Sequence, residues 1–122
     1  MQHLKIIGAE KDFNEWFQEV FGYGYGTGER PILEGLKRFL SLANGNSAGN
    51  QYDFEILEKE LTPIVTWLLI CALCKDSCIE YGTSPRYGWL TEKGMSLRSF
   101  MADKSIDELY EITCAHFEEE SL

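Results

Sequence analysis

The stretch that decides the fold is Leu61–Gly94, LTPIVTWLLICALCKDSCIEYGTSPRYGWLTEKG. Thr62 is a good helix N-cap, and Pro63 suits the first helical position, where its missing N–H breaks no hydrogen bond. Thr91, followed by Glu92, is a second N-cap. The expected elements, in order, are a helix over Pro63–Lys75, a strand over Cys78–Tyr81, a turn over Ser84–Gly88, a returning strand over Trp89–Thr91 and a helix that ends near Met101.

Helices are also expected on both sides of this stretch. Residues 9–21 carry an aromatic stripe at helical spacing, which either packs on the core or forms an arm that docks on a partner's core. Further helices are expected over residues 29–43 and over Phe54–Glu60, which Asp53 caps at its N-terminus. A last helix is expected to begin at the Ser105–Glu108 capping box. The predicted fold is mainly α with a small β-hairpin (α+β), in a single domain spanning residues 1–122.

The segment Leu90-Thr91-Glu92-Lys93-Gly94 resembles the end of the wing in winged helix-turn-helix regulators of the MarR and PadR type. Leu61, Leu73 and Ile79 fall where those families keep apolar core residues. The resemblance implies a winged-helix-like core, three helices and a wing, over residues 31–101. The remaining segments are an N-terminal helix with a Gly/Tyr loop, 1–28, and a C-terminal helix with an acidic tail, 102–122.

The charge balance opposes nucleic acid as a partner. The chain has 20 acidic and 11 basic residues and a formal net charge of −9, whereas nucleic-acid binding draws its affinity from Lys and Arg on phosphates. The run from Leu61 to Lys75 is too short to span a bilayer, so no membrane partner is expected. Four cysteines without a secretion signal indicate reduced thiols and a cytoplasmic location.

The residue types on the outer side of the helix over Pro63–Lys75 indicate whether it binds DNA or protein. Base readout needs polar and basic side chains there, but this helix offers Ile64, Trp67, Leu68 and Cys71. We expect these four residues to form an interaction face covered by a terminal helix or by a second subunit, because an exposed apolar patch aggregates or finds a partner. Pro63–Lys75 should then be the most buried segment of the chain.

The predicted wing is aromatic and poor in charge. Its characteristic residues are Tyr81, Arg86, Tyr87 and Trp89, and we expect it to pack back on the domain or to contact a protein. The candidate phosphate contacts are Lys75, Arg86, Lys93 and Arg98. Such cations steady a phosphate backbone but do not specify a base sequence.

The cysteines raise the question of a metal site. Cys71, Cys74 and Cys78 stand at i, i+3 and i+7, and Cys114 lies near the C-terminus. Cys-x2-Cys is a spacing of zinc and iron–sulfur sites, but here it falls in a Leu/Ile-rich helix, where a free cysteine packs as a small hydrophobe. We expect no metal and no cofactor, with these four cysteines as the alternative ligand set.

Two functional classes remain. The two histidines, His3 and His116, lie near the termini, and no spacing of residues indicates a catalytic set, so no enzyme is expected. Residue chemistry favours a non-enzymatic winged-helix interaction module, a regulator or adaptor that binds a protein partner, a second copy as a homodimer, or both. The winged-helix resemblance favours the alternative, a DNA-binding transcriptional regulator.

Overall fold

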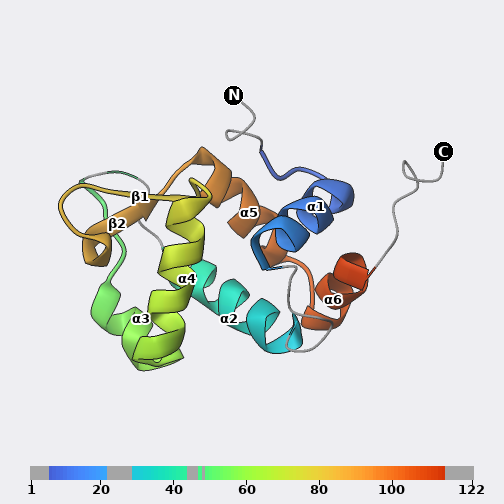
Figure 1. The fold of residues 1–122 in the computed structure, drawn as a ribbon, viewed down its shortest axis with the longest axis horizontal. Coiled ribbons are helices and arrows are strands. Elements are labelled where there is room, and N and C mark those ends of the chain that lie inside the picture. The colour runs from blue at the N-terminus through green and yellow to red at the C-terminus, as the bar shows by residue number, and fades with distance from the viewer. Residues whose placement is uncertain (1–5, 22–28, 44–46, 48, 115–122) are drawn as a thin grey trace.

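The computed structural model describes residues 6–21, 29–43, 47 and 49–114. In this part of the chain, six α-helices accompany one antiparallel hairpin, so the fold is mainly α with a small β component, as predicted (Figure 1). The elements are α1 (Glu10–Phe21), α2 (Glu29–Leu42), α3 (Phe54–Leu61), α4 (Pro63–Lys75), β1 (Ile79–Tyr81), the 3-10 turn η2 (Pro85–Tyr87), β2 (Gly88–Leu90), α5 (Glu92–Ala102) and α6 (Ile106–Cys114). No helix among the described residues has the length and apolar character needed to cross a membrane.

Helices α3 and α4 are joined by a single residue, Thr62. Thr62 has φ 77°, a conformation that residues other than glycine rarely adopt, and it caps both helices. Its N–H donates to the carbonyl of Glu58 in α3, and its side-chain oxygen accepts from the N–H of Val65 in α4. The buried hydroxyl of Thr66 lies within hydrogen-bond distance of the carbonyls of Leu57 and Thr62. These bonds fix the rotation of α4 relative to α3.

The hairpin forms where the sequence predicts it: β1 begins one residue later than predicted, and β2 lies one residue earlier. Ile79 of β1 lies opposite Leu90 of β2, and both side chains are buried. On the other edge of β2, the Tyr52 N–H donates to the carbonyl of Gly88 at 2.9 Å. The Tyr52 hydroxyl donates to the carbonyl of Pro85 in η2. Tyr52 therefore ties the hairpin to the segment that leads into α3.

The Leu-Thr-x-Lys-Gly segment holds the start of α5 against the start of the hairpin. Thr91 caps α5 by accepting from the Gly94 N–H at 3.1 Å, and its own hydroxyl donates to the carbonyl of Ser77 at 2.6 Å. A Cβ on Gly94 would collide with the carbonyl oxygen of Cys78. Glycine is therefore needed at position 94 for close approach between two backbones.

The helices near the two ends of the chain form as predicted. Phe13 and Phe17 of α1 are buried, and the Phe13 ring stacks on Phe100 of α5 with centroids 5.1 Å apart. The aromatic stripe of α1 thus packs on the core of its own chain. α6 begins at the predicted capping box, in which Ser105 and Glu108 exchange side-chain to backbone hydrogen bonds.

Helix α4 buries one side only. Its buried residues are Thr66, Leu69, Ile70 and Leu73, and its main packing partners are α2, α3 and β1. On the opposite side Ile64 is 74% exposed and Leu68 is 65% exposed. The prediction that Pro63–Lys75 is the most buried segment is therefore wrong, as is the prediction that a terminal helix covers its outer side. The apolar residues of α4 surround the whole helix, but its neighbours reach only half of it.

Two adjacent leucines test this orientation of α4. Leu69→Ala should lower the free energy of unfolding by about 2–5 kcal/mol, because it leaves a cavity in the core. Leu68→Ala, the same change on the outer side, should alter it by about 0.5 kcal/mol or less. Urea unfolding at low protein concentration measures both values, and helix propensity cancels between the two variants. Equal losses in the two variants would contradict the orientation.

Candidate interaction face

The outer side of α4 carries an unbroken row of apolar side chains. We call Ile64, Leu68 and Cys71 the α4 face; all three are exposed and they follow one another at intervals of four and three residues. Val65, beside them, is 37% exposed. Three of the four predicted face residues therefore lie at the surface. The α4 face can bind by apolar contact, and the thiol of Cys71 is its single reactive group.

Trp67, the fourth predicted face residue, is half-buried at the side of the α4 face. Its ring packs on Phe54 of α3, with centroids 5.1 Å apart. The guanidinium of Arg86 in η2 lies over the same Phe54 ring, 4.4 Å from its centroid. Phe54 is thus the shared contact between α4 and the hairpin turn. Trp67 is therefore partly used in packing within its own chain. Ile64 and Leu68 are the more accessible of the predicted face residues.

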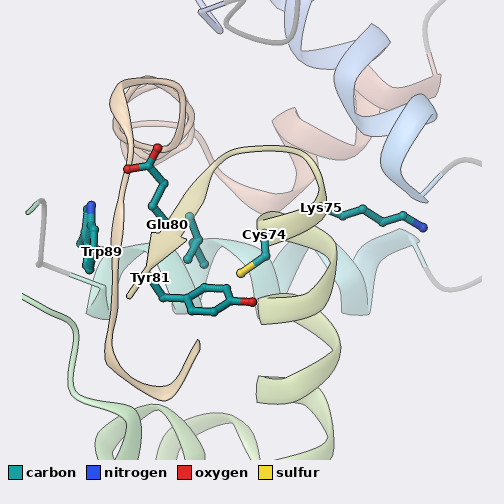
Figure 2. A pocket seen from close by; sticks show the side chains of 6 residues that line it. Cys74, Lys75, Glu80, Tyr81 and Trp89 are labelled. Carbon is teal, nitrogen blue, oxygen red and sulfur yellow. The ribbon is translucent and has the colours of Figure 1, made fainter. Parts of the chain in front are cut away.

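An open groove of about 580 Å³ lies between the C-terminal end of α4 and the hairpin (Figure 2). Its lining residues are Cys74, Lys75, Ile79, Glu80, Tyr81 and Trp89. Tyr81 extends from β1 toward Cys74, while Lys75 points away from them. Two aromatic residues, Tyr81 and Trp89, therefore line the groove, with Glu80 and Lys75 as its one acidic and one basic residue.

The hairpin that the sequence predicts to be a wing is anchored through its backbone, and several of its side chains are exposed. Tyr52 holds the carbonyls of Pro85 and Gly88, as described above. Even so, Tyr81 is 44% exposed and Tyr87 is 55% exposed, and Trp89 is half-buried. The hairpin therefore packs back on the domain through one edge, and its aromatic side chains remain partly accessible to another molecule.

Two of the four candidate phosphate contacts are engaged within the domain. Lys93 is 7% exposed, and its ammonium lies 2.9 Å from the carboxylate of Asp76. Arg98 is half-buried and donates to the carbonyl of Ala43 at 3.0 Å. Lys75 and Arg86 are exposed, and the Arg86 guanidinium also lies over the Phe54 ring. The set that the sequence suggested thus offers two of its four cations to a ligand in this conformation.

Asp76 is the centre of a polar cluster that the sequence analysis missed. It follows α4, pairs with Lys93 of α5, and accepts from the indole N–H of Trp16 in α1. The thiol of Cys78 lies 3.8 Å from the same carboxylate. Burial, and then the negative charge of Asp76, raise the pKa of Cys78 to about 12. The sequence contains two signals for this cluster: Asp76 stands at the end of a helix, and Lys93 stands directly before Gly94. The sequence does not show that they pair, because the residues of the cluster are far apart in the chain.

The four cysteines do not gather into a ligand set. Cys71 and Cys114 are exposed, Cys74 is half-buried, and Cys78 is buried, all as free thiols. Burial raises the pKa of Cys74 to about 11, and the nearby Cys71 adds to this shift. Within the described ranges, no three His, Cys, Asp or Glu side chains come close enough to hold a metal ion. Both histidines lie outside those ranges.

Comparison with known proteins adds no relative. No protein-family model, no curated protein and no solved structure matches this chain. The likeness of Leu90–Gly94 to the wing of winged-helix regulators therefore stays a prediction, and any function must be argued from the residues themselves.

The Lys93–Asp76 pair should contribute much more to stability than an exposed lysine. Lys93→Met keeps most of the side-chain volume but leaves the largely buried Asp76 carboxylate without its cationic partner, with the Trp16 indole N–H still bonded to it. This loss should cost about 3 kcal/mol. Lys75→Met, on the exposed end of α4, should cost about 0.5 kcal/mol or less. Thermal or urea unfolding compares the two variants. Adding Asp76→Asn to Lys93→Met should recover part of the loss, and equal effects of the two lysine variants would contradict the role of the pair.

Proposed function

We propose that this chain is a non-enzymatic interaction module that binds a protein through the α4 face. The observation that carries the proposal is the exposure of Ile64 and Leu68, at 74% and 65%, on a helix whose other side is anchored in the core. Burial of such a side chain contributes about 1.5–3 kcal/mol. A row of these residues can therefore supply binding energy to a complex. On an isolated chain the same row would favour aggregation.

The distribution of charge supports the same proposal. Among the six helices of the described chain, α4 alone contains no aspartate or glutamate. The net charge of −9 keeps the rest of the surface soluble, and a partner that approaches α4 meets no row of carboxylates on that helix. The core of a protein interface is likewise poor in charged residues. The module would act as a regulator or adaptor, on a fold that we propose to be of the winged-helix type.

The free cysteines favour a location in a reducing compartment. The four thiols are free, and Cys71 is exposed on the proposed binding face, where oxidation would add a polar group. We therefore place the module in the cytoplasm, where thiols are kept reduced.

A photo-crosslinking residue at position 68 tests the proposed function in cells that produce the protein. If the α4 face binds a protein, light should trap one defined adduct, either with a second copy or with one other protein. The same probe at Ser99, an exposed position on α5, is the matched control and should trap none. The proposal would be wrong if position 68 gave no adduct, or the same pattern as position 99, while the variants remained folded.

A second candidate is DNA binding, favoured by one observation. Lys75 on α4 and Arg86 in the hairpin turn are exposed on the two elements that the winged-helix resemblance assigns to DNA. Two exposed cations supply little counterion release against a chain of charge −9, and the α4 face lacks the donors and acceptors that read base edges.

We therefore expect no sequence-specific DNA binding at physiological salt. A fluorescence anisotropy titration over a randomised duplex pool should yield at most weak binding that disappears as salt rises. A defined duplex bound with nanomolar affinity, and lost in Arg86→Ala but not in Arg38→Ala, would contradict this expectation. Arg38 is the control because it is an exposed arginine on α2, paired with Glu60.

A further inference from the structure

We infer that the partner of the α4 face is a second copy of this chain, bound through antiparallel pairing of the two α4 helices. This inference rests on the proposed function, since it names the occupant of the same face. It is carried by three features of α4: the spacing of its exposed residues, the absence of acidic residues from the helix, and the position of its single lysine.

The exposed residues of α4 have the spacing of a helix-pairing seam. Ile64, Leu68, Cys71 and Lys75 are separated by four, three and four residues, which is the d–a–d–a pattern of a heptad repeat. All four are exposed, and the seam extends about 16 Å along the helix at 1.5 Å per residue. A straight seam of this kind fits another helix, and α4 of a second copy presents the same seam.

The charges of the chain permit self-association along α4 and oppose it elsewhere. Two copies of charge −9 repel each other, and five of the six described helices carry carboxylates. Pairing along α4 brings together the two helices that have none. The groove beside the seam is lined by one acidic residue, Glu80, and by Lys75 from the end of the seam, so the border of the contact is not uniformly acidic. A symmetric pair uses the same patch on both copies.

Lys75 sets the direction of the pair. In a parallel pair the two Lys75 side chains would meet in one layer of the seam, with like charges opposed. In an antiparallel pair, Lys75 of each copy lies opposite Ile64 of the other, where its aliphatic stem covers apolar surface and its ammonium reaches water. Leu68 then lies opposite Cys71 in both central layers. A single lysine in a seam is a recognised determinant of register.

This register places the two Cys71 thiols near the symmetry axis. They are offset by three residues, about 4.5 Å along the helix, across helix axes about 8–10 Å apart. A short bismaleimide can span such a gap. The seam is under two heptads long and buries few side chains, so the pair should be a reversible one, populated at micromolar concentrations or above.

Purified protein with Cys114→Ser tests the inference, because Cys71 is then the one exposed thiol among the described residues, with Cys74 half-buried and Cys78 buried. Sedimentation velocity should show a shift from monomer to dimer as concentration rises through the micromolar range. A short bismaleimide should trap a species of twice the mass of the chain, and adding Cys71→Ser should abolish it.

Two glutamate variants separate the seam from other apolar surface. Leu68→Glu places a charge in the centre of the seam and should shift the dimer dissociation constant at least tenfold toward monomer. Ile56→Glu is the matched control: Ile56 is 46% exposed on α3, outside the seam, and the dimer should remain. Circular dichroism verifies that both variants are folded, as their exposure leads us to expect.

The outcomes distinguish this inference from the proposed function. A chain that stays monomeric at high micromolar concentration and gives no Cys71 crosslink would overturn the second copy as partner. The proposed function would still stand if the probe at position 68 trapped a different protein in cells. A dimer that survives Leu68→Glu, or that is lost in Ile56→Glu instead, would place the contact elsewhere and also overturn the inference.

Discussion

The structure depends on the single-residue junction at Thr62. With one residue between α3 and α4, the second helix has no free length with which to adjust its rotation. Thr62 adopts φ 77°, and the surrounding caps and the Thr66 hydroxyl hold it there. Strain of this kind persists only where the neighbouring structure determines it. The junction therefore fixes the rotation of α4 relative to α3 and determines which side of α4 faces that helix.

The other end of α4 is fixed by a different kind of contact. Asp76 joins the end of α4 to α5 through Lys93 and to α1 through the indole of Trp16. Because both ends are held, the α4 face lies on a helix that would lose little freedom in the binding that we propose. Rigid presentation lowers the entropic cost of association. A small apolar face can then support a specific contact that a mobile segment of the same composition would not.

The Asp76 cluster gives Lys93, in the predicted wing segment Leu90–Gly94, a structural role. In the sequence, Lys93 stands in a motif associated with DNA-binding regulators and was therefore a candidate phosphate contact. In the fold its ammonium pairs with Asp76 and is 7% exposed, and Gly94 beside it is needed because Cys78 approaches closely. Both residues thus have structural roles that require no ligand. The motif accounts for the packing of α5 on the hairpin and does not by itself argue for DNA.

The sequence alone determined the secondary structure and the class of the fold. The caps at Thr62, Thr91 and Ser105, with the turn before Gly88, act over a few residues, so local chemistry was sufficient to place the helices and the hairpin. The aromatic stripe of α1 likewise identified its own buried side. In α4 the spacing of apolar residues did not identify the buried side, because apolar residues surround the helix and no period distinguishes its two sides. Which side is covered depends on where α2, α3 and β1 lie, and the pairing of Asp76 with Lys93 and Trp16 depends on contacts between residues far apart in the chain. Only the tertiary structure decided these, because such contacts have no local signature.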